Sequence, residues 1–168
     1  MEITQRELKD FKMRNFPVEI CFKPIGIIHT PFKDLRGIPI QASMSENDGK
    51  IEIFTEFQEG LKDLDGFSHL ICLYYFDMVQ LPVALRSKPF LVDEVKGVFA
   101  IRTPFRPNPI GLSVLKIKEI AANFISVAQV DILDKTPLID IKPYIPQFDS
   151  PKTTKIGWLK KKIRKMVS

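Results

Sequence analysis

The sequence predicts an all-β fold: a single-domain, curved antiparallel β-barrel with long loops and a short basic C-terminal helix. A chain of 168 residues that is 45% hydrophobic can bury the core of one domain. Segments rich in β-branched and aromatic residues recur along the chain with turn-forming residues between them, which is the pattern of strands. The roughly seven strands that this pattern indicates cover residues 18–30, 50–57, 67–77, 97–103, 112–120, 123–133 and 137–144.

Irregular alternation within 112–120 favours a barrel over a flat sheet. Its apolar residues Leu112, Val114, Ile117 and Ile120 slip phase once, as they would in a bulged or strongly curved strand. Strong curvature is what allows a sheet to close on itself.

The connections between strands are long and contain little helix. Residues 31–49 and 80–95 exceed an ordinary hairpin loop, so functional side chains are expected there. A single helical turn is expected in 56–67, before Gly60 or Gly66 interrupts it.

The C-terminal segment has a different pattern. Apolar residues recur at three- and four-residue spacing with lysines between them, which predicts an amphipathic helix of about three turns that docks by its apolar stripe. The stripe consists of Ile156, Leu159, Ile163, Met166 and Val167. The chain therefore divides into an N-terminal extension with a short helical pattern (1–17), a barrel domain (18–150) and a basic helix (151–168).

The net charge of +5 is carried by the C-terminal segment. Residues 151–168 hold seven basic and no acidic side chains, whereas residues 1–150 hold 18 basic and 20 acidic ones. A cationic tail on a nearly neutral body fits attraction to a polyanion such as RNA. A solvated lysine face explains the same pattern equally well.

Membrane insertion and secretion are not expected. The longest apolar run, residues 70–76, is far shorter than the roughly 20 residues that span a bilayer, and the first ten residues are too polar for a signal peptide. Cys21 and Cys72 lie in strand-like segments, so they are expected to be reduced core thiols in a soluble, cytoplasmic protein.

Several kinds of catalytic site lack their residues. There is no glycine-rich phosphate loop and no serine in a nucleophile elbow. The two histidines, His29 and His69, lie in different strands without metal-ligand spacing, and His69 is expected to be a half-buried strand residue. No metal site is expected.

A proline-rich loop is the strongest candidate for a binding site. Pro104, Pro107 and Pro109 fix the backbone around the side chains of Arg106 and Asn108, just after Arg102. A preordered guanidinium and amide suit recognition of a carboxylate, a phosphate or an adenine edge. The alternative is that the arginines pair with neighbouring carboxylates and close one end of the barrel.

A second polar cluster follows further along the chain. Alternation would place Gln129 and Asp131 on one face of a strand, and Asp140 and Lys142 on one face of the next, with Asp134 in the turn between them. Carboxylates placed in this way could receive ribose hydroxyls or a cation, or act as a base. The alternative is a surface ion pair between Asp140 and Lys142 and a turn cap at Asp134.

Five motifs make the sequence resemble the TsaA-like family, also called YaeB, over roughly residues 18–148. They are "PIGIIHTPF" from Pro24, "GIPIQ" from Gly37, "LDGFSHL" from Leu64, "RTPFRPNPIGLSV" from Arg102 and "DILDKTPLIDIKPYIP" from Asp131. The resemblance implies a β-barrel homodimer that uses S-adenosylmethionine to methylate N6 of threonylcarbamoyladenosine beside the anticodon of a threonine tRNA.

The resemblance also implies roles for particular residues. Arg102 matches the arginine expected to contact the methyl donor, and Asp131 or Asp134 is the candidate for a catalytic carboxylate, although no dedicated base is required. Donor-binding candidates are Gln41, Ala42, Ser43, Met44, Asp77, Met78, Val79, Arg102, Leu112, Ala128, Gln129, Val130, Asp131 and Asp134. Substrate-binding candidates are Arg106, Asn108, Lys142, Lys155, Lys160, Lys161, Lys162 and Arg164.

Three residues depart from the pattern of the bacterial members. Ile40 replaces an arginine, Asp77 a histidine and Lys135 a glycine. The same chemistry on a different acceptor is therefore an alternative function. A non-catalytic module that binds S-adenosylmethionine or RNA is another, and a barrel without a ligand is a third.

Overall fold

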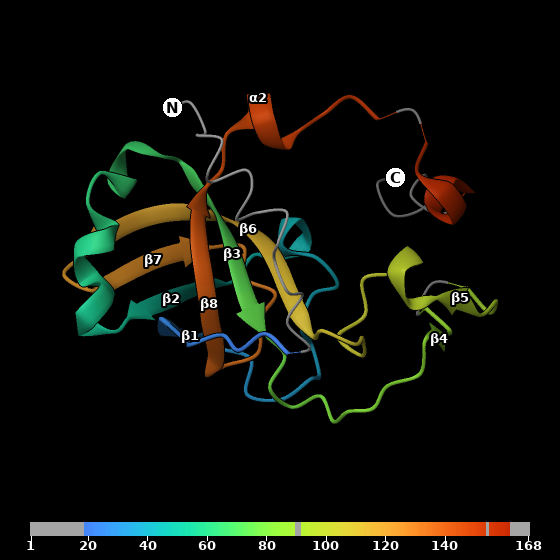
Figure 1. The fold of residues 1–168 in the computed structure, drawn as a ribbon. Helices are drawn as coiled ribbons and strands as arrows, with labels where there is room; N and C mark the ends of the chain where they lie inside the picture. Colours follow the sequence, from blue (N-terminus) through green and yellow to red (C-terminus); the bar gives the residue numbers. More distant parts are fainter. Residues whose placement is uncertain (1–18, 90–91, 154, 162–168) are drawn as a thin grey trace, which may run out of the picture.

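Six antiparallel strands close into one barrel in the computed structural model (Figure 1), in the order β1-β2-β7-β6-β3-β8. The structure describes residues 19–89, 92–153 and 155–161. The barrel strands are β1 (Gly26–His29), β2 (Asp48–Ile53), β3 (His69–Tyr75), β6 (Ile110–Ala121), β7 (Phe124–Ala128) and β8 (Thr136–Pro143). The prediction of an all-β antiparallel barrel is confirmed.

Alternating side chains fill the interior of the barrel. In β3, Leu70, Cys72 and Tyr74 are buried while their neighbours are half-buried or exposed. β3 pairs with β6 from His69 opposite Lys116 to Tyr75 opposite Ile110. Burial of this apolar face is the main stabilising contribution to the barrel.

Strand β6 contains the irregularity that its sequence predicts. Its register against β7 shifts between Ile117 and Glu119. The inward face at the start of the strand carries Gly111, Ser113 and Leu115, however, and Leu112 points outward with 56% of its surface exposed. Gly111 leaves space that the Tyr74 ring fills, and Ser113 places a hydroxyl inside this end of the barrel.

The strand predicted at 97–103 is wrong for most of its length. Only Lys96–Gly97 forms a strand, β5, which pairs with β4 (Arg86–Ser87) outside the barrel. A 3-10 helix, η4 (Val98–Ala100), follows at once. Val98 and Ile101 are buried by packing rather than by sheet pairing, which explains why their apolar pattern resembles that of a strand.

The first predicted strand is shorter than expected. Of the described residues 19–30, Gly26–His29 forms the strand, with Ile25 adding a backbone hydrogen bond to Leu138, and Ile20 and Phe22 are exposed. Cys21 is exposed as well, so the prediction of a core thiol is wrong there. Cys72 is buried in β3, and burial raises the pKa of its thiol.

Helical turns occupy the predicted region near residue 56, as 3-10 helices η2 (Thr55–Leu61) and η3 (Leu64–Gly66). A short α-helix, α2 (Pro146–Asp149), follows β8. In the tail, the described residues contain the 3-10 helix η5 (Gly157–Lys161). The remainder of the predicted tail helix, 162–168, and the N-terminal extension lie outside the described residues.

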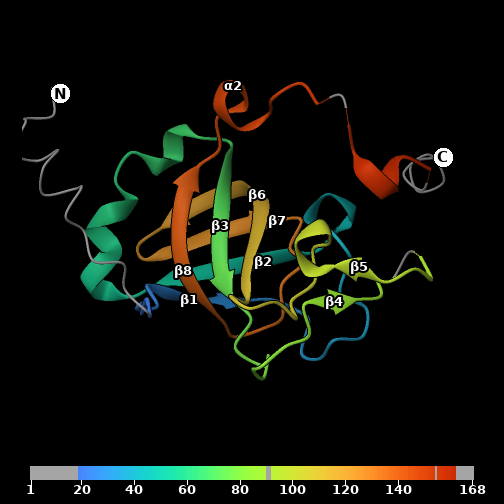
Figure 2. The ribbon, with the colours of Figure 1, turned by 45° about the vertical axis from the view of Figure 1, so that its right-hand side comes forward.

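The tail lies beside the segment that precedes Arg102. Trp158 Nε1 donates a hydrogen bond to the carbonyl oxygen of Ala100 at 2.8 Å. Figures 1 and 2 both place η5 next to β5 and η4, away from the barrel. The contact that anchors the described tail is therefore the indole of Trp158, which the predicted apolar stripe did not include.

Lys135 has a backbone conformation that favours glycine, since its φ is +66°. We expect Lys135→Gly to raise the free energy of unfolding by about 0.5–1 kcal/mol. Glycine relieves the strain of the left-handed backbone, and part of that stabilisation is cancelled because glycine also increases the conformational entropy of the unfolded chain. Thermal denaturation should show a melting temperature roughly 2 °C higher. Lys116→Gly, in the extended strand β6, is the control and should lower it; a lower melting temperature for Lys135→Gly would contradict the prediction.

Candidate active site

Arg102 contacts the segment that follows the long first connection. Its Nη1 donates a hydrogen bond to Gln41 Oε1 at 2.9 Å, across 61 residues of sequence. Gln41 immediately precedes the 3-10 helix η1 (Ala42–Met44). Two groups of donor-binding candidates that are distant in sequence are thus in direct contact.

Asp131 joins the same cluster from the opposite direction. Ser113 Oγ donates a hydrogen bond to Asp131 Oδ1 at 2.6 Å, and the backbone N–H of Ala42 also bonds this carboxylate. The start of η1 therefore touches Arg102 through Gln41 and Asp131 through Ala42. We name the cluster of Arg102, Gln41, Ala42, Ser113 and Asp131 the arginine–aspartate site.

Tyr74 supports the serine from inside the barrel. Its hydroxyl lies 3.2 Å from Ser113 Oγ, and because the serine proton points to Asp131, the tyrosine is the donor. A Cβ on Gly111 would lie 2.1 Å from the Tyr74 ring, so glycine at this position lets the ring approach the serine. Burial raises the pKa of Tyr74, which keeps its hydroxyl protonated.

The described surroundings of Asp131 hold its carboxyl group by hydrogen bonds and supply no cation. Burial raises the pKa of Asp131 above its ordinary value, and the hydrogen bonds from Ser113 and Ala42 act in the opposite direction. No cation pairs with Asp131 among the described residues. Its free lone pairs can therefore accept ligand hydroxyls or face a positive charge.

The proline loop is tied to the end of β3. The backbone N–H of Phe76 donates to the carbonyl oxygen of Pro109 at 2.8 Å, which places Asp77, Met78 and Val79 next to this loop. Met78 is 71% exposed. Met44 and Leu112 are exposed too, so this side of the molecule offers apolar surface as well as the arginine and the carboxylate.

The arginines of the loop do not pair with any carboxylate of the described residues. Arg102 bonds an amide oxygen and keeps its other N–H groups unbonded within the described part of the chain. Arg106 and Asn108 likewise form no side-chain hydrogen bond or ion pair with described residues. The alternative, in which these arginines pair with neighbouring carboxylates, is therefore not what the structure contains.

The predicted strand face of Gln129 and Asp131 is wrong. β7 ends at Ala128, and Gln129 has a φ of +64°, so the chain turns there and the alternation stops. Val130 is fully buried, and its N–H donates to the carbonyl oxygen of Asn47. This turn is what brings Asp131 to η1.

Asp134 lies outside the arginine–aspartate site. Its Oδ1 accepts a hydrogen bond from the Thr30 N–H at 2.9 Å, and Lys33 Nζ lies 2.5 Å from its Oδ2. Burial acts to raise the pKa of Asp134, but the contacts with Lys33 and Thr30 lower it below the ordinary value. The structure thus separates the two candidate carboxylates and confirms Asp134 as a cap of the turn.

The other substrate-binding candidates are dispersed. Lys142 pairs with Asp140 at 2.6 Å on β8, the arrangement expected of a surface pair, and its contact with substrate stays a prediction. Lys155 and Lys160 are exposed in the tail. The side chain of Lys161 and both Lys162 and Arg164 lie outside the described residues.

Sequence reasoning missed Ser113 and Tyr74. The available signal was a serine within an apolar strand, because a buried hydroxyl needs a partner and Asp131 is that partner.

His69 is half-buried as expected and shares a hydrogen bond with Ser68. Within the described ranges no group of three potential metal ligands occurs, and no helix is long and apolar enough to cross a bilayer.

Comparison with known sequences assigns the chain to a family. The family model described as the tRNA-methyltransferase O N-terminal domain matches residues 27–150. The chain belongs to the TrmO family. A TrmO crystal structure from Pseudomonas aeruginosa superimposes with a TM-score of 0.71 at 34% identity, covering 83% of this chain and 62% of that chain.

Relatives in the TrmO family carry two kinds of name. A Pyrococcus abyssi protein named a probable S-adenosyl-L-methionine-binding protein is 49% identical over 89% of this chain and 82% of its own length. The Escherichia coli tRNA (adenine(37)-N6)-methyltransferase is 31% identical over 77% of this chain. This chain spans 59% of the Escherichia coli protein.

Proposed function

We propose that this protein transfers the methyl group of S-adenosylmethionine to the exocyclic N6 of an adenine in tRNA. The observation that carries the proposal is the arginine–aspartate site, in which Arg102, Gln41 and Asp131 meet around η1. These residues belong to three of the motifs that mark the TrmO family. The names of the relatives supply the donor and the acceptor.

The side chains of the site suit this donor. Arg102 has unbonded N–H groups within the described residues for a carboxylate, and Asp131 can accept ribose hydroxyls or face the sulfonium. Leu112 and Met44 offer exposed apolar surface for a base. S-adenosylmethionine supplies an already activated methyl group, so the protein contributes positioning and electrostatics.

The proposed acceptor is N6 of threonylcarbamoyladenosine beside the anticodon of a threonine tRNA. Arg106 and Asn108 project from the stiff loop without bonding described side chains, which leaves them for substrate. A nitrogen that has been alkylated loses its proton readily, so the site needs no dedicated base. The active form that we propose is a homodimer.

We further propose that the barrel domain and the tail have different roles. The barrel domain, residues 18–150, holds the donor, and the tail, residues 151–168, attracts the RNA backbone with its seven basic residues. Trp158 holds η5 against Ala100, two residues before Arg102. Cationic side chains such as Lys155 and Lys160 are thereby kept on the side of the molecule where the donor would bind.

Binding of tRNA is expected to depend steeply on salt. If the tail releases several counterions, affinity should fall by roughly tenfold or more between 50 and 200 mM salt. Fluorescence anisotropy with the full chain measures this slope. Replacing Lys155, Lys160, Lys161 and Lys162 with glutamine should flatten it, while arginine at the same positions should preserve it; an affinity that does not change with salt would rule out the role of the tail.

Transfer of labelled methyl from S-adenosylmethionine to tRNA tests the function itself. Two tRNA pools are compared, one with and one without the threonylcarbamoyl modification. Label on the modified pool alone supports the proposed acceptor. Label on neither pool, with the donor still bound, would favour another acceptor or a non-catalytic binding module, and Ile40, Asp77 and Lys135 would then be the residues to examine.

A further inference from the structure

An open pocket of about 750 Å³ lies on the barrel away from the arginine–aspartate site. The ends of β1 and β2, the bulge of β6, the end of β7 and the turn before β8 form its walls. None of Arg102, Gln41, Ala42, Ser113 and Asp131 lines it. We call this pocket the lysine groove because Lys33, Lys50, Lys118 and Lys135 line it.

Two of the four lysines already have carboxylate partners within the groove. Lys33 lies 2.5 Å from Asp134, and Lys118 lies 2.6 Å from Asp48. Both lysine side chains remain at least half exposed, so their ammonium groups are accessible to a further anion. The Lys118–Asp48 pair is exposed on both sides and contributes little, so it can open, whereas the buried Asp134 carboxylate keeps Lys33 in place at the wall of the groove.

The other two lysines have no carboxylate partner in the described part of the chain. Neither Lys50 nor Lys135 forms an ion pair with a described residue, and the Lys50 ammonium lies 5.9 Å from the centroid of the Phe124 ring. Glu119 is the one further carboxylate in the lining, and His29, which also lines the groove, lies 2.8 Å from Glu52. With His29 neutral the lining keeps one net positive charge, and its unpaired ammonium groups attract anions.

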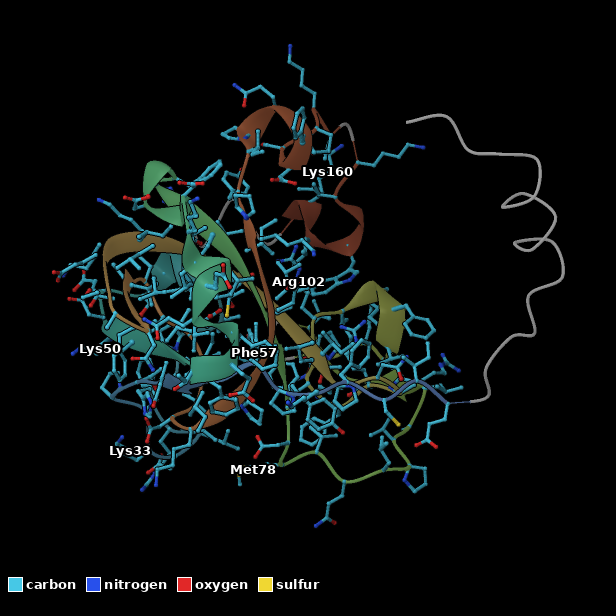
Figure 3. The ribbon with its side chains drawn as sticks, turned by 60° about the vertical axis from the view of Figure 1, so that its left-hand side comes forward. Lys33, Lys50, Phe57, Met78, Arg102 and Lys160 are labelled. Carbon is cyan, nitrogen blue, oxygen red and sulfur yellow. The ribbon has the colours of Figure 1, made fainter. Side chains whose placement is uncertain are left out.

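One short turn connects the groove to the arginine–aspartate site. Asp131 bonds Ser113 and Ala42 in that site, and three residues later Asp134 and then Lys135 line the groove. Three residues of extended chain span at most about 10 Å, so the backbone at Asp134 lies within about 10 Å of that at Asp131. In the view of Figure 3, Arg102 lies between Lys33 and Lys50 on one side and Lys160 on the other.

We propose that the lysine groove binds the phosphate backbone of the RNA strand next to the methylated base. This inference rests on the proposed function, because the bound RNA is the methyl acceptor. A strand whose base reaches the arginine–aspartate site would pass the turn at 131–134 and meet Lys135 and Lys50. The tail would hold the same RNA from the other side.

Equilibrium binding of tRNA to the full chain tests the groove. The variant combines Lys50→Ala with Lys135→Gly, the second of which favours folding. We expect its affinity for tRNA at 0.1 M salt to fall roughly threefold to tenfold, and the slope of log affinity against log salt to decrease by about 1–2. Affinity for S-adenosylmethionine should not change.

A matched variant removes the same charge elsewhere. Among the described residues Lys23 pairs with exposed Glu56 and lies over the Phe57 ring, and Lys62 has no ion-pair partner, so Lys23→Ala with Lys62→Ala is the control. Equal tRNA affinity and equal salt slopes for the two double variants would overturn the proposal. A second result would also overturn it: inorganic phosphate binds saturably to the wild type, and the groove variant loses this binding but keeps its affinity for tRNA. That result would assign the groove to a small anion.

Methyl transfer separates this inference from the function on which it rests. Wild-type protein that binds tRNA through the groove but transfers no methyl group would refute the proposed function and leave the groove as an RNA-binding surface. If the wild-type protein methylates tRNA and both double variants do so with the same KM for tRNA, the groove proposal alone is refuted.

Discussion

Alanine in place of Arg102 is expected to weaken binding of S-adenosylmethionine by more than about tenfold, or 1.4 kcal/mol. Arg102 is exposed and has one described partner, the side-chain oxygen of Gln41, at 2.9 Å. The remaining N–H groups form a planar fork that matches a carboxylate. Removing the fork takes away a charge-assisted contact and leaves Gln41 Oε1 without its described donor.

Isothermal titration with S-adenosylmethionine measures the effect directly. Arg102→Lys keeps the charge but not the fork, so its affinity should lie between those of wild type and Arg102→Ala. Arg36→Ala is the matched control, because Arg36 is 92% exposed and, among the described residues, bonds Asp34 alone, two residues earlier. Equal affinity for wild type and Arg102→Ala would remove Arg102 from the donor site.

Strand content and barrel closure could be predicted because both depend on local pattern. Alternation in β3, β7 and β8 marks one buried face, and the phase slip in β6 marks the bulge. The prediction of a strand at 97–103 was wrong because apolar residues signal burial and not hydrogen-bonding partners. Val98 and Ile101 are buried by a 3-10 turn just as effectively as they would be by a strand.

The site could be predicted only as a set of separate segments. Each segment carries a recognisable motif, but the bond between Arg102 and Gln41 spans 61 residues and the bond between Asp131 and Ser113 spans 18. Such contacts depend on the positions of β6 and η1 in the closed barrel. The left-handed backbone at Gln129 is also invisible to an alternation pattern, and it is the turn that brings Asp131 to η1.

Replacing Asp131 with asparagine is expected to reduce methyl transfer by about 100-fold or more while the fold survives. Asparagine keeps an oxygen that can accept the hydrogen bond from Ser113, so the network around Tyr74 is retained. What disappears is the negative charge, which has no cationic partner among the described residues. The charge is therefore available to a cationic donor and to ribose hydroxyls.

Asp131→Asn is expected to keep or raise the stability of the fold although it lowers methyl transfer. Burial raises the pKa of Asp131 in the folded protein, so the fold favours the protonated carboxyl. The stabilising contribution of this group is therefore complete below the unfolded pKa and is lost as pH rises through the raised folded pKa. At neutral pH the ionised carboxylate costs stability, and thermal denaturation should show Asp131→Asn melting at or above the wild-type temperature.

The pH dependence of methyl transfer gives an independent readout. If ionised Asp131 is the active form, kcat/KM should fall as pH decreases through a pKa higher than that of an ordinary aspartate, and this acidic limb should be absent from the residual activity of Asp131→Asn. Asp65→Asn, at an exposed position in η3, is the control and should retain wild-type activity and the wild-type acidic limb. An Asp131→Asn variant with wild-type methyl transfer, or with the acidic limb unchanged, would show that the charge of Asp131 is not what the site uses.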